Sequence, residues 1–170
     1  EATGFLMSYT DLDERHPALA VSRWGSTCGT VPELEASAAV LEALCRYRRA
    51  SGRTEPDPWI RALAEFLLFM QRDDGLFYFQ YDADDGFRSL PRGGEQQIAL
   101  HARAAHALCL AYEELAVRKY LSAAERAMDR LMELHGTDSG SDQRPWTAGE
   151  ARWTASAALE LSLMVPTDRY

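Results

Sequence analysis

Carboxylate side chains stand where three predicted helices begin and in one acidic turn. Glu33 and Glu35 open the first of these helices, Glu95 opens the second and Glu150 the third. Asp84 lies in an Asp-Asp-Gly turn of the same chain. Two carboxyl groups on either side of a glycosidic bond can hydrolyse it, so the candidate pairs are Asp84 with Glu95 and Glu95 with Glu150. Ordinary first-turn acids would give the same pattern, because they stabilise the positive end of a helix dipole.

Histidine supplies a second candidate chemistry. His101 lies two turns into the helix predicted over residues 95–117, where it could carry a proton in a lyase or epimerase reaction. A core histidine with satisfied hydrogen bonds is the alternative. His106 follows five positions later, about 140° around the helix, so the two rings do not form a simple metal pair. Metal-ligand spacings and nucleotide-binding fingerprints do not occur, and the sequence implies no metal and no cofactor.

Aromatic and polar residues gather in the connections between the predicted helices. Sugars are bound by stacking on aromatic rings and by hydrogen bonds from carboxylate, guanidinium and amide groups. The candidate substrate-binding residues are Trp24, Tyr78, Tyr81, Arg92, Gln96, Trp146 and Glu150. Strand alternation is the competing explanation for residues 76–81, because it places Phe77, Phe79 and Tyr81 on one side, facing the core.

The elements that must position these residues repeat about every 60 positions, a period that points to a helical array. Residues 36–45 resemble 105–109 and 155–161, and residues 61–68 resemble 126–132. Apolar spacing, Pro and Gly predict helices over about 32–50, 58–71, 95–117, 120–135 and 149–164, and a strand over about 76–81. We expect a single domain, 1–170, with partial repeats 1–31, 32–94, 95–148 and 149–170.

The predicted helices fall into two kinds. The first, third and fifth are rich in Ala and nearly apolar around their circumference, which is typical of an inner, doubly covered layer. The second and fourth carry charge on one face, which is typical of an outer layer. Connections from an outer helix back to an inner one are long and carry Gly, aromatic and acidic residues. One face of the array is therefore expected to carry long loops with the candidate site residues. The predicted fold class is therefore all-α, with helical hairpin repeats in a toroid-like array and a small β-hairpin.

One segment resembles the pattern of (α/α) toroid proteins in which a helix is followed by Q-x-x-D-G-x-aromatic. It is Phe66-Leu67-Leu68-Phe69-Met70-Gln71-Arg72-Asp73-Asp74-Gly75-Leu76-Phe77. The (α/α) toroid proteins include six-hairpin glycosidases, epimerases of the N-acylglucosamine 2-epimerase type and the squalene/terpene cyclases. The resemblance covers about residues 33–165. It implies a cavity that opens at the N-terminal ends of the inner helices and is rimmed by the long loops.

A full toroid of this kind has about five to seven hairpins, and this chain holds roughly two and a half. It could be a piece of a longer protein, a chain that closes by forming a homo-oligomer, or a small open array. We expect a piece or a reduced relative, because the first repeat starts in the middle of a helix.

Two further motifs carry less weight. Asp82-Ala83-Asp84-Asp85 fits the D-x-D-D proton donor of class II terpene cyclases, but Gly86-Phe87 follows it where Thr is usual. Gly93-Gly94-Glu95-Gln96 resembles the G-C-G-E-Q of thioester domains. Gly94 stands at the thiol position, so a thioester cannot form there.

The charge and amino-acid composition of the chain limit the kinds of partner that it can bind. The net charge of −8 argues against a nucleic-acid surface. Apolar runs long enough to span a membrane are absent from the sequence. The three cysteines do not form a disulfide framework; Cys45 and Cys109 are expected to be buried, and Cys28 lies in a loop. A reducing, cytoplasmic location is favoured, with a processed secreted form as the alternative.

The leading interpretation is a carbohydrate-active enzyme, or a fragment of one, that acts on a glycan or sugar as a hydrolase, lyase or epimerase. Glu95, Asp84 and His101 are its catalytic candidates. The alternative is a non-catalytic helical-repeat module that binds a glycan or a protein. A third is a terpene-cyclase-like protein that uses the Asp-rich turn.

Overall fold

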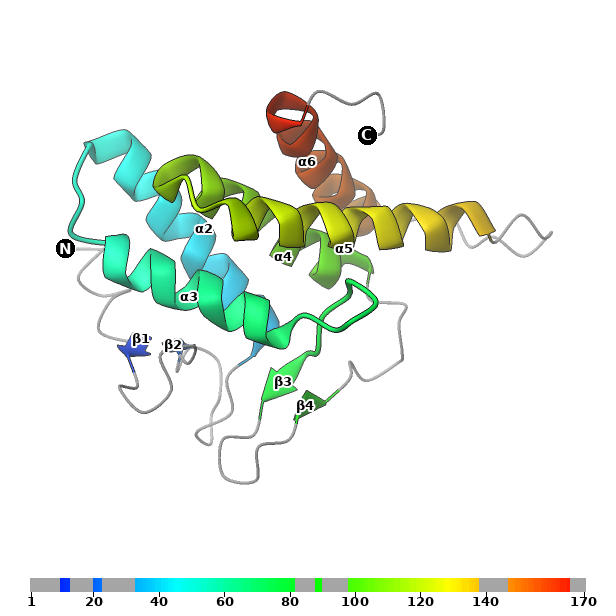
Figure 1. The fold of residues 1–170 in the computed structure, drawn as a ribbon, viewed down its shortest axis with the longest axis horizontal. Coiled ribbons are helices and arrows are strands. Elements are labelled where there is room, and N and C mark those ends of the chain that lie inside the picture. Colours follow the sequence, from blue (N-terminus) through cyan, green and yellow to red (C-terminus); the bar gives the residue numbers. More distant parts are fainter. Residues whose placement is uncertain are drawn as a thin grey trace.

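The computed structural model describes residues 10–12, 20–22, 33–81, 88–89, 98–137 and 147–165. These residues form helices and four short strands (Figure 1): β1 (Thr10–Leu12), β2 (Ala20–Ser22), α2 (Leu34–Ser51), α3 (Asp57–Met70), β3 (Gln80–Tyr81), β4 (Arg88–Ser89), α4 (Ile98–Leu115), α5 (Arg118–Thr137) and α6 (Ala148–Met164). All five predicted helices are present, and the ends that the structure describes differ from prediction by three residues or fewer.

Helix α4 lies at the centre of the array. It packs against α2 on one side and α6 on the other, and it forms a hairpin with α5, while α2 forms a hairpin with α3. Every residue from 104 to 111 is buried, so α4 is covered around its whole circumference, as its Ala-rich composition predicts. The inner layer is therefore α2, α4 and α6, and the outer layer is α3 and α5. Among the described helices, none has the length and hydropathy to cross a membrane.

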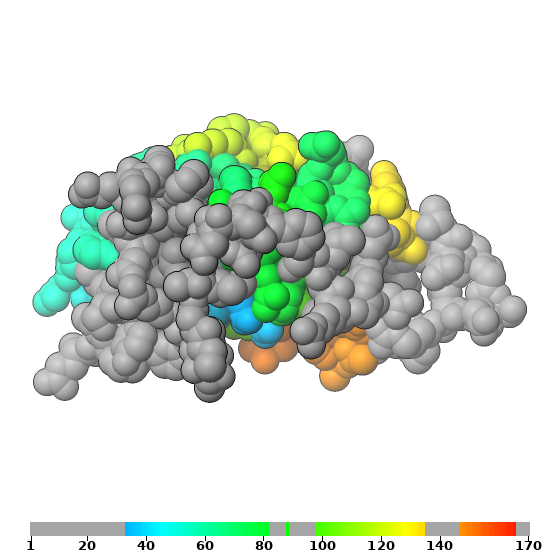
Figure 2. Space-filling model, turned by 90° about the horizontal axis from the view of Figure 1, so that it is seen from below, coloured from blue at the N-terminus to red at the C-terminus, as the bar shows by residue number. Residues whose placement is uncertain are grey.

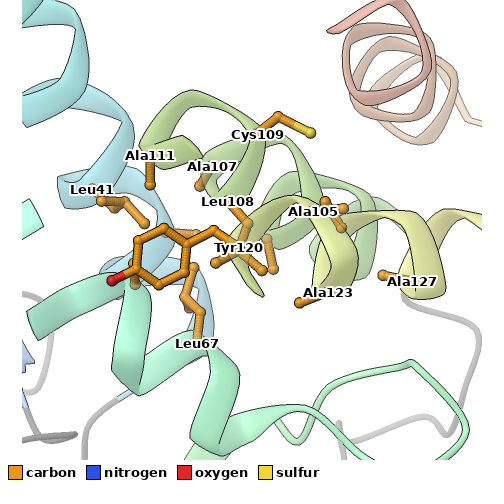
Figure 3. Packing of buried hydrophobic residues seen from close by; sticks show 14 of the residues in the cluster. Leu41, Leu67, Ala105, Ala107, Leu108, Cys109, Ala111, Tyr120, Ala123 and Ala127 are labelled. Atoms are coloured by element: carbon orange, nitrogen blue, oxygen red, sulfur yellow. The ribbon is translucent and has the colours of Figure 1, made fainter. Parts of the chain in front are cut away.

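The core fills the space between the two layers. Tyr120 of α5 is fully buried, and Figure 3 shows its ring among Leu41 of α2, Leu67 of α3 and Leu108 of α4. Its hydroxyl donates a hydrogen bond of 2.8 Å to Glu65 Oε1, so the one polar atom of this ring is satisfied. One side chain thus joins four helices.

Ion pairs fix the C-terminal ends of α2 and α4. Arg48 donates to Asp57 at the start of α3 over 2.6 Å and to Glu114 of α4 over 2.9 Å. Arg49 donates to Glu114 over 2.8 Å and also pairs with Glu113. Both guanidinium groups share Glu114, and such a network contributes more to stability than isolated surface pairs do. These ion pairs therefore hold the C-terminal ends of α2 and α4 and the start of α3 together.

The loop after α3 docks onto the next outer helix. Gln71 Nε2 donates to the carbonyl oxygen of Gly75 over 2.9 Å and to that of Ala123, in α5, over 2.8 Å. Gly75 has a φ of +93°, and a Cβ at this position would lie 2.6 Å from the carbonyl oxygen of Arg126. The Q-x-x-D-G motif therefore joins one hairpin to the next.

The strand predicted over residues 76–81 is wrong for its first four residues. The backbone there turns back on the end of α3: Tyr78 N–H donates to Met70 O over 2.8 Å, and Gln71 forms an isolated bridge with Phe77. Only Gln80 and Tyr81 form β3, which pairs antiparallel with β4. The small predicted hairpin is thus present but shorter. The antiparallel β1–β2 pair, which packs on α2 and α3, was not predicted.

Cys45 and Cys109 are buried and free, as predicted, whereas Cys28 lies outside the described residues. Burial raises the pKa of Cys45 to about 12, and it raises the pKa of Cys109 as well. Because the thiolate is the reactive form, we expect both thiols to react with a disulfide reagent at pH 8 at least about a hundredfold more slowly in the native protein than in urea. Thiol titration of a Cys28→Ser variant measures this directly. Rapid native labelling of two thiols would show that the helices open readily.

Candidate functional site

The described residues place the small hairpin beside the start of α2. Leu34 N–H donates to Phe79 O over 2.8 Å, and Gln80 Nε2 donates to Glu33 Oε1 over 3.0 Å. Figure 2 shows the same side of the molecule, with the green hairpin segment next to the blue start of α2. The hairpin stem therefore borders the N-terminal face of the inner layer, which we call the mouth.

All three inner helices start at this mouth. Glu35 lies in the first turn of α2, Arg103 in the second turn of α4 and Trp153 in the second turn of α6. Arg103 Nη1 donates to Glu35 over 3.3 Å, and the Arg103 guanidinium lies 4.7 Å from the centre of the Trp153 ring. The first two turns of the three inner helices therefore meet at the mouth.

Six of the predicted site residues fall outside the described residues, as does the Asp-rich turn at 82–85. They are Trp24, Asp84, Arg92, Glu95, Gln96 and Trp146. The structure describes the other four: Tyr78, Tyr81, His101 and Glu150.

Tyr78 and Tyr81 belong to the hairpin stem. Tyr81 is 6% exposed and packs edge-to-face on Phe69 of α3, with ring centres 5.0 Å apart. Tyr78 is half-buried under Arg88, whose guanidinium lies 4.7 Å from the centre of the Tyr78 ring and 5.0 Å from that of Phe69. Arg88 also donates to Phe69 O over 2.8 Å. These contacts fasten the hairpin to the end of α3, and Tyr78 retains the more accessible ring.

His101 is buried beneath the loop that follows α3. Its Nδ1 accepts a hydrogen bond of 3.2 Å from Phe77 N–H, and the two rings stack with centres 6.2 Å apart. In the neutral ring this bond assigns the proton to Nε2. The geometry favours the core-histidine alternative, in which His101 positions the loop.

Glu150 forms a capping box at the start of α6. Its carboxylate accepts from Thr147 N–H over 2.7 Å, and its own N–H donates to Thr147 Oγ1 over 3.2 Å. The residue is 5% exposed. This arrangement satisfies two backbone N–H groups that a helix end otherwise leaves without a partner. The Glu150 carboxylate therefore stabilises the start of α6.

A charged cluster across the inner helices was not predicted. It consists of Glu42 of α2, Arg103 and His106 of α4 and Trp153 of α6, and we call it the inner-helix cluster. His106 Nδ1 lies 3.9 Å from Glu42 Oε1, and the His106 and Trp153 rings are 5.9 Å apart. Burial lowers the pKa of His106, and Glu42 opposes this effect. Helical spacing offered one signal: Arg103 and His106 are three residues apart and so share a face of α4.

The mouth combines carboxylate, guanidinium and aromatic groups. Glu35 is exposed, Arg103 and Trp153 are partly exposed, and Tyr78 lies on the neighbouring stem. Such groups can accept hydrogen bonds from hydroxyls, donate to ring oxygens and stack on apolar faces. In the part of the chain that the structure describes, no group of three or more His, Cys, Asp or Glu side chains could hold a metal ion.

Paired helices with an inner and an outer layer define an (α/α) toroid-like array. Three solved structures share this fold. The chain is similar to a family 76 glycoside hydrolase from a bovine Bacteroides thetaiotaomicron strain, with a TM-score of 0.64 and 15% identity over 84% of this chain and 33% of that one. It is also similar to a family 76 alpha-mannanase from Bacteroides thetaiotaomicron, with a TM-score of 0.66 and 12% identity over 98% of this chain and 45% of that one.

The third structure is a family 76 glycoside hydrolase described as a mannosidase, from Bacteroides thetaiotaomicron VPI-5482. Its TM-score is 0.62 and its identity 17%, over 85% of this chain and 42% of that one. The chain therefore spans between a third and just under half of the length of these enzymes. No protein-family model matches the chain, and no curated protein matches it. The resemblance to six-hairpin glycosidases is thus confirmed for the fold.

Proposed function

We propose that this chain is, or is part of, a carbohydrate-active enzyme that binds a glycan at the mouth of the inner helices. The observation that carries the proposal is the fold shared with three glycoside hydrolases at TM-scores of 0.62 to 0.66. The groups around the mouth support it, because Glu35, Arg103 and Tyr78 are of the types that bind sugars.

An α-linked mannan is the substrate class to test first. One of the similar structures is described as an alpha-mannanase and another as a mannosidase. The reaction proposed is hydrolysis, in which one carboxyl group protonates the leaving oxygen and a second acts as base or nucleophile. We assign these roles to Glu95 and Asp84, and we assign His101 the positioning of the loop after α3.

The binding residues proposed around this pair are Trp24, Tyr78, Tyr81, Arg92, Gln96, Trp146 and Glu150. Of the three that the structure describes, Tyr78 has a partly accessible ring on which a sugar could stack. Tyr81 and Glu150 would act by holding the hairpin and the start of α6, because both are more than nine-tenths buried.

A non-catalytic glycan-binding module is the second candidate. It is favoured by one observation, namely that the chain spans less than half of the similar enzymes. A partial array presents an open concave face, and such faces serve as binding surfaces in helical-repeat proteins.

One experiment separates the two candidates. The chain is incubated with yeast-type α-mannan and α-linked mannooligosaccharides, and both new reducing ends and binding heat are measured. Release of reducing ends supports the enzyme. Binding without release supports the module. The absence of both, in a protein shown to be folded, would contradict mannan as the substrate class, and a panel of other glycans would then decide whether the glycan proposal survives.

A further inference from the structure

His106 lies where the three inner helices meet. The residue is 3% exposed, between Glu42 of α2 and Trp153 of α6. Its Nδ1 is buried and makes no hydrogen bond in the structure. A buried imidazole nitrogen without a partner is unusual, because most buried polar atoms are satisfied. The site is therefore unlike that of His101, whose Nδ1 accepts a backbone N–H.

The carboxylate nearest to this nitrogen is already shared. Glu42 Oε1 lies 3.9 Å from His106 Nδ1, but it accepts a hydrogen bond of 2.6 Å from Arg46. Its other oxygen lies 4.0 Å from Arg103 Nε. The remaining charged group that influences the ring is Glu113, about two turns further along α4 and paired with Arg49. A protonated His106 would be the third cation beside Glu42, after Arg46 and Arg103.

We propose that His106 is a pH-sensitive joint, in which protonation draws Glu42 toward the imidazolium, weakens the 4.0 Å ion pair between Glu42 and Arg103 and changes the packing of Trp153. The change passes to Trp153 because the Arg103 guanidinium lies 4.7 Å from the centre of its ring. All three inner helices take part, since Glu42 belongs to α2, Arg103 to α4 and Trp153 to α6. The joint lies beside the mouth, but the inference does not depend on what the mouth binds.

The direction of the pH effect follows from burial. Burial lowers the pKa of His106 below its ordinary value of 6.5, so the ring is neutral at pH 7. In the unfolded chain the same ring takes up its proton near pH 6.5. Between these two values the unfolded state binds more protons than the native state, so this group makes the native state less stable as the pH falls below about 6.5. Its contribution is constant above that pH.

Tryptophan fluorescence tests the joint, because a protonated imidazole quenches an indole in contact with it. We expect the wild-type protein to lose part of its emission between pH 7.5 and 4.5, with a midpoint below 6.5. The step should be absent from His106→Gln and from Trp153→Phe. Trp59→Phe, a change on α3, is the matched control and should keep the step.

Nuclear magnetic resonance of the wild-type ring provides a second readout that needs no His106 variant. The His106 carbon-bound protons should titrate with the same midpoint as the fluorescence. Glu42→Gln should move that midpoint to lower pH, since the variant lacks the carboxylate that most favours the charged ring. The proposal is overturned if the fluorescence step persists in His106→Gln, or if the His106 ring titrates without any change at Trp153.

Discussion

Turnover of α-mannan is expected to fall by about 10² to 10⁴-fold when Glu95 is replaced by glutamine, and by a similar factor in Asp84→Asn. This range is what general acid–base catalysis by a positioned side chain typically contributes. Each amide keeps the shape of the carboxyl group but can neither give up nor accept the proton. The measurement is kcat and KM for mannan hydrolysis by each variant and by the wild-type chain.

Glu55→Gln is the matched control for these two variants. Glu55 lies in the connection between α2 and α3, at the end of the array opposite the mouth, and its side chain is 47% exposed. We expect its turnover to stay within about twofold of the wild type, because surface substitutions away from the chemistry have small effects. Unchanged turnover in both Glu95→Gln and Asp84→Asn would remove these residues from the acid and base roles.

Gly75→Ala is expected to lower the free energy of unfolding by about 3 kcal/mol. Two effects add at this position. The φ of +93° is one that residues with a Cβ rarely adopt, which costs on the order of 1 kcal/mol or more. The new methyl group would also lie 2.6 Å from the carbonyl oxygen of Arg126, and a backbone atom in a helix cannot move aside easily. Urea unfolding measured by circular dichroism gives the difference.

Gly52→Ala separates the two effects. Gly52 ends α2 with a φ of +69°, but a Cβ there would meet nothing within 4 Å. We expect a loss of about 1 kcal/mol, from backbone strain alone. Equal losses at Gly52 and Gly75 would mean that the loop after α3 can lift away from α5, and that the contact with Arg126 does not hold the hairpins together.

The helices could be predicted because their sequence signals are local. Apolar spacing near 3.6 residues, together with Pro32, Pro58 and the Gly52 stop, defined each helix from its own residues. The backbone of residues 76–79 could not be predicted in the same way, because the strand that the sequence predicts there does not form. Its alternating aromatics follow the strand pattern, but the backbone of Tyr78 bonds to Met70 at the end of α3. That pairing depends on the turn between them.

The candidate site was predicted less completely, because it is made by contacts between helices. First-turn acids were expected at the mouth, and Glu35 does meet Arg103 there. Glu150 follows the same pattern, yet its carboxylate caps α6. The inner-helix cluster was missed because Glu42 and His106 are more than sixty positions apart, and only the packing of α2 on α4 brings them together.

The burial of α4 on all sides also bears on how relatives of this chain can be found. Its alanines between positions 102 and 111 are fully buried, and larger side chains in such a close-packed interior would be destabilising. The exposed faces of α3 and α5 are under no such constraint. Divergent relatives should therefore keep the spacing of small residues in this one helix after most other positions have changed, which is how a shared fold can persist at 12 to 17% identity. A sequence search that gives more weight to the small residues of α4 should therefore find more distant relatives than a search that weights all positions equally.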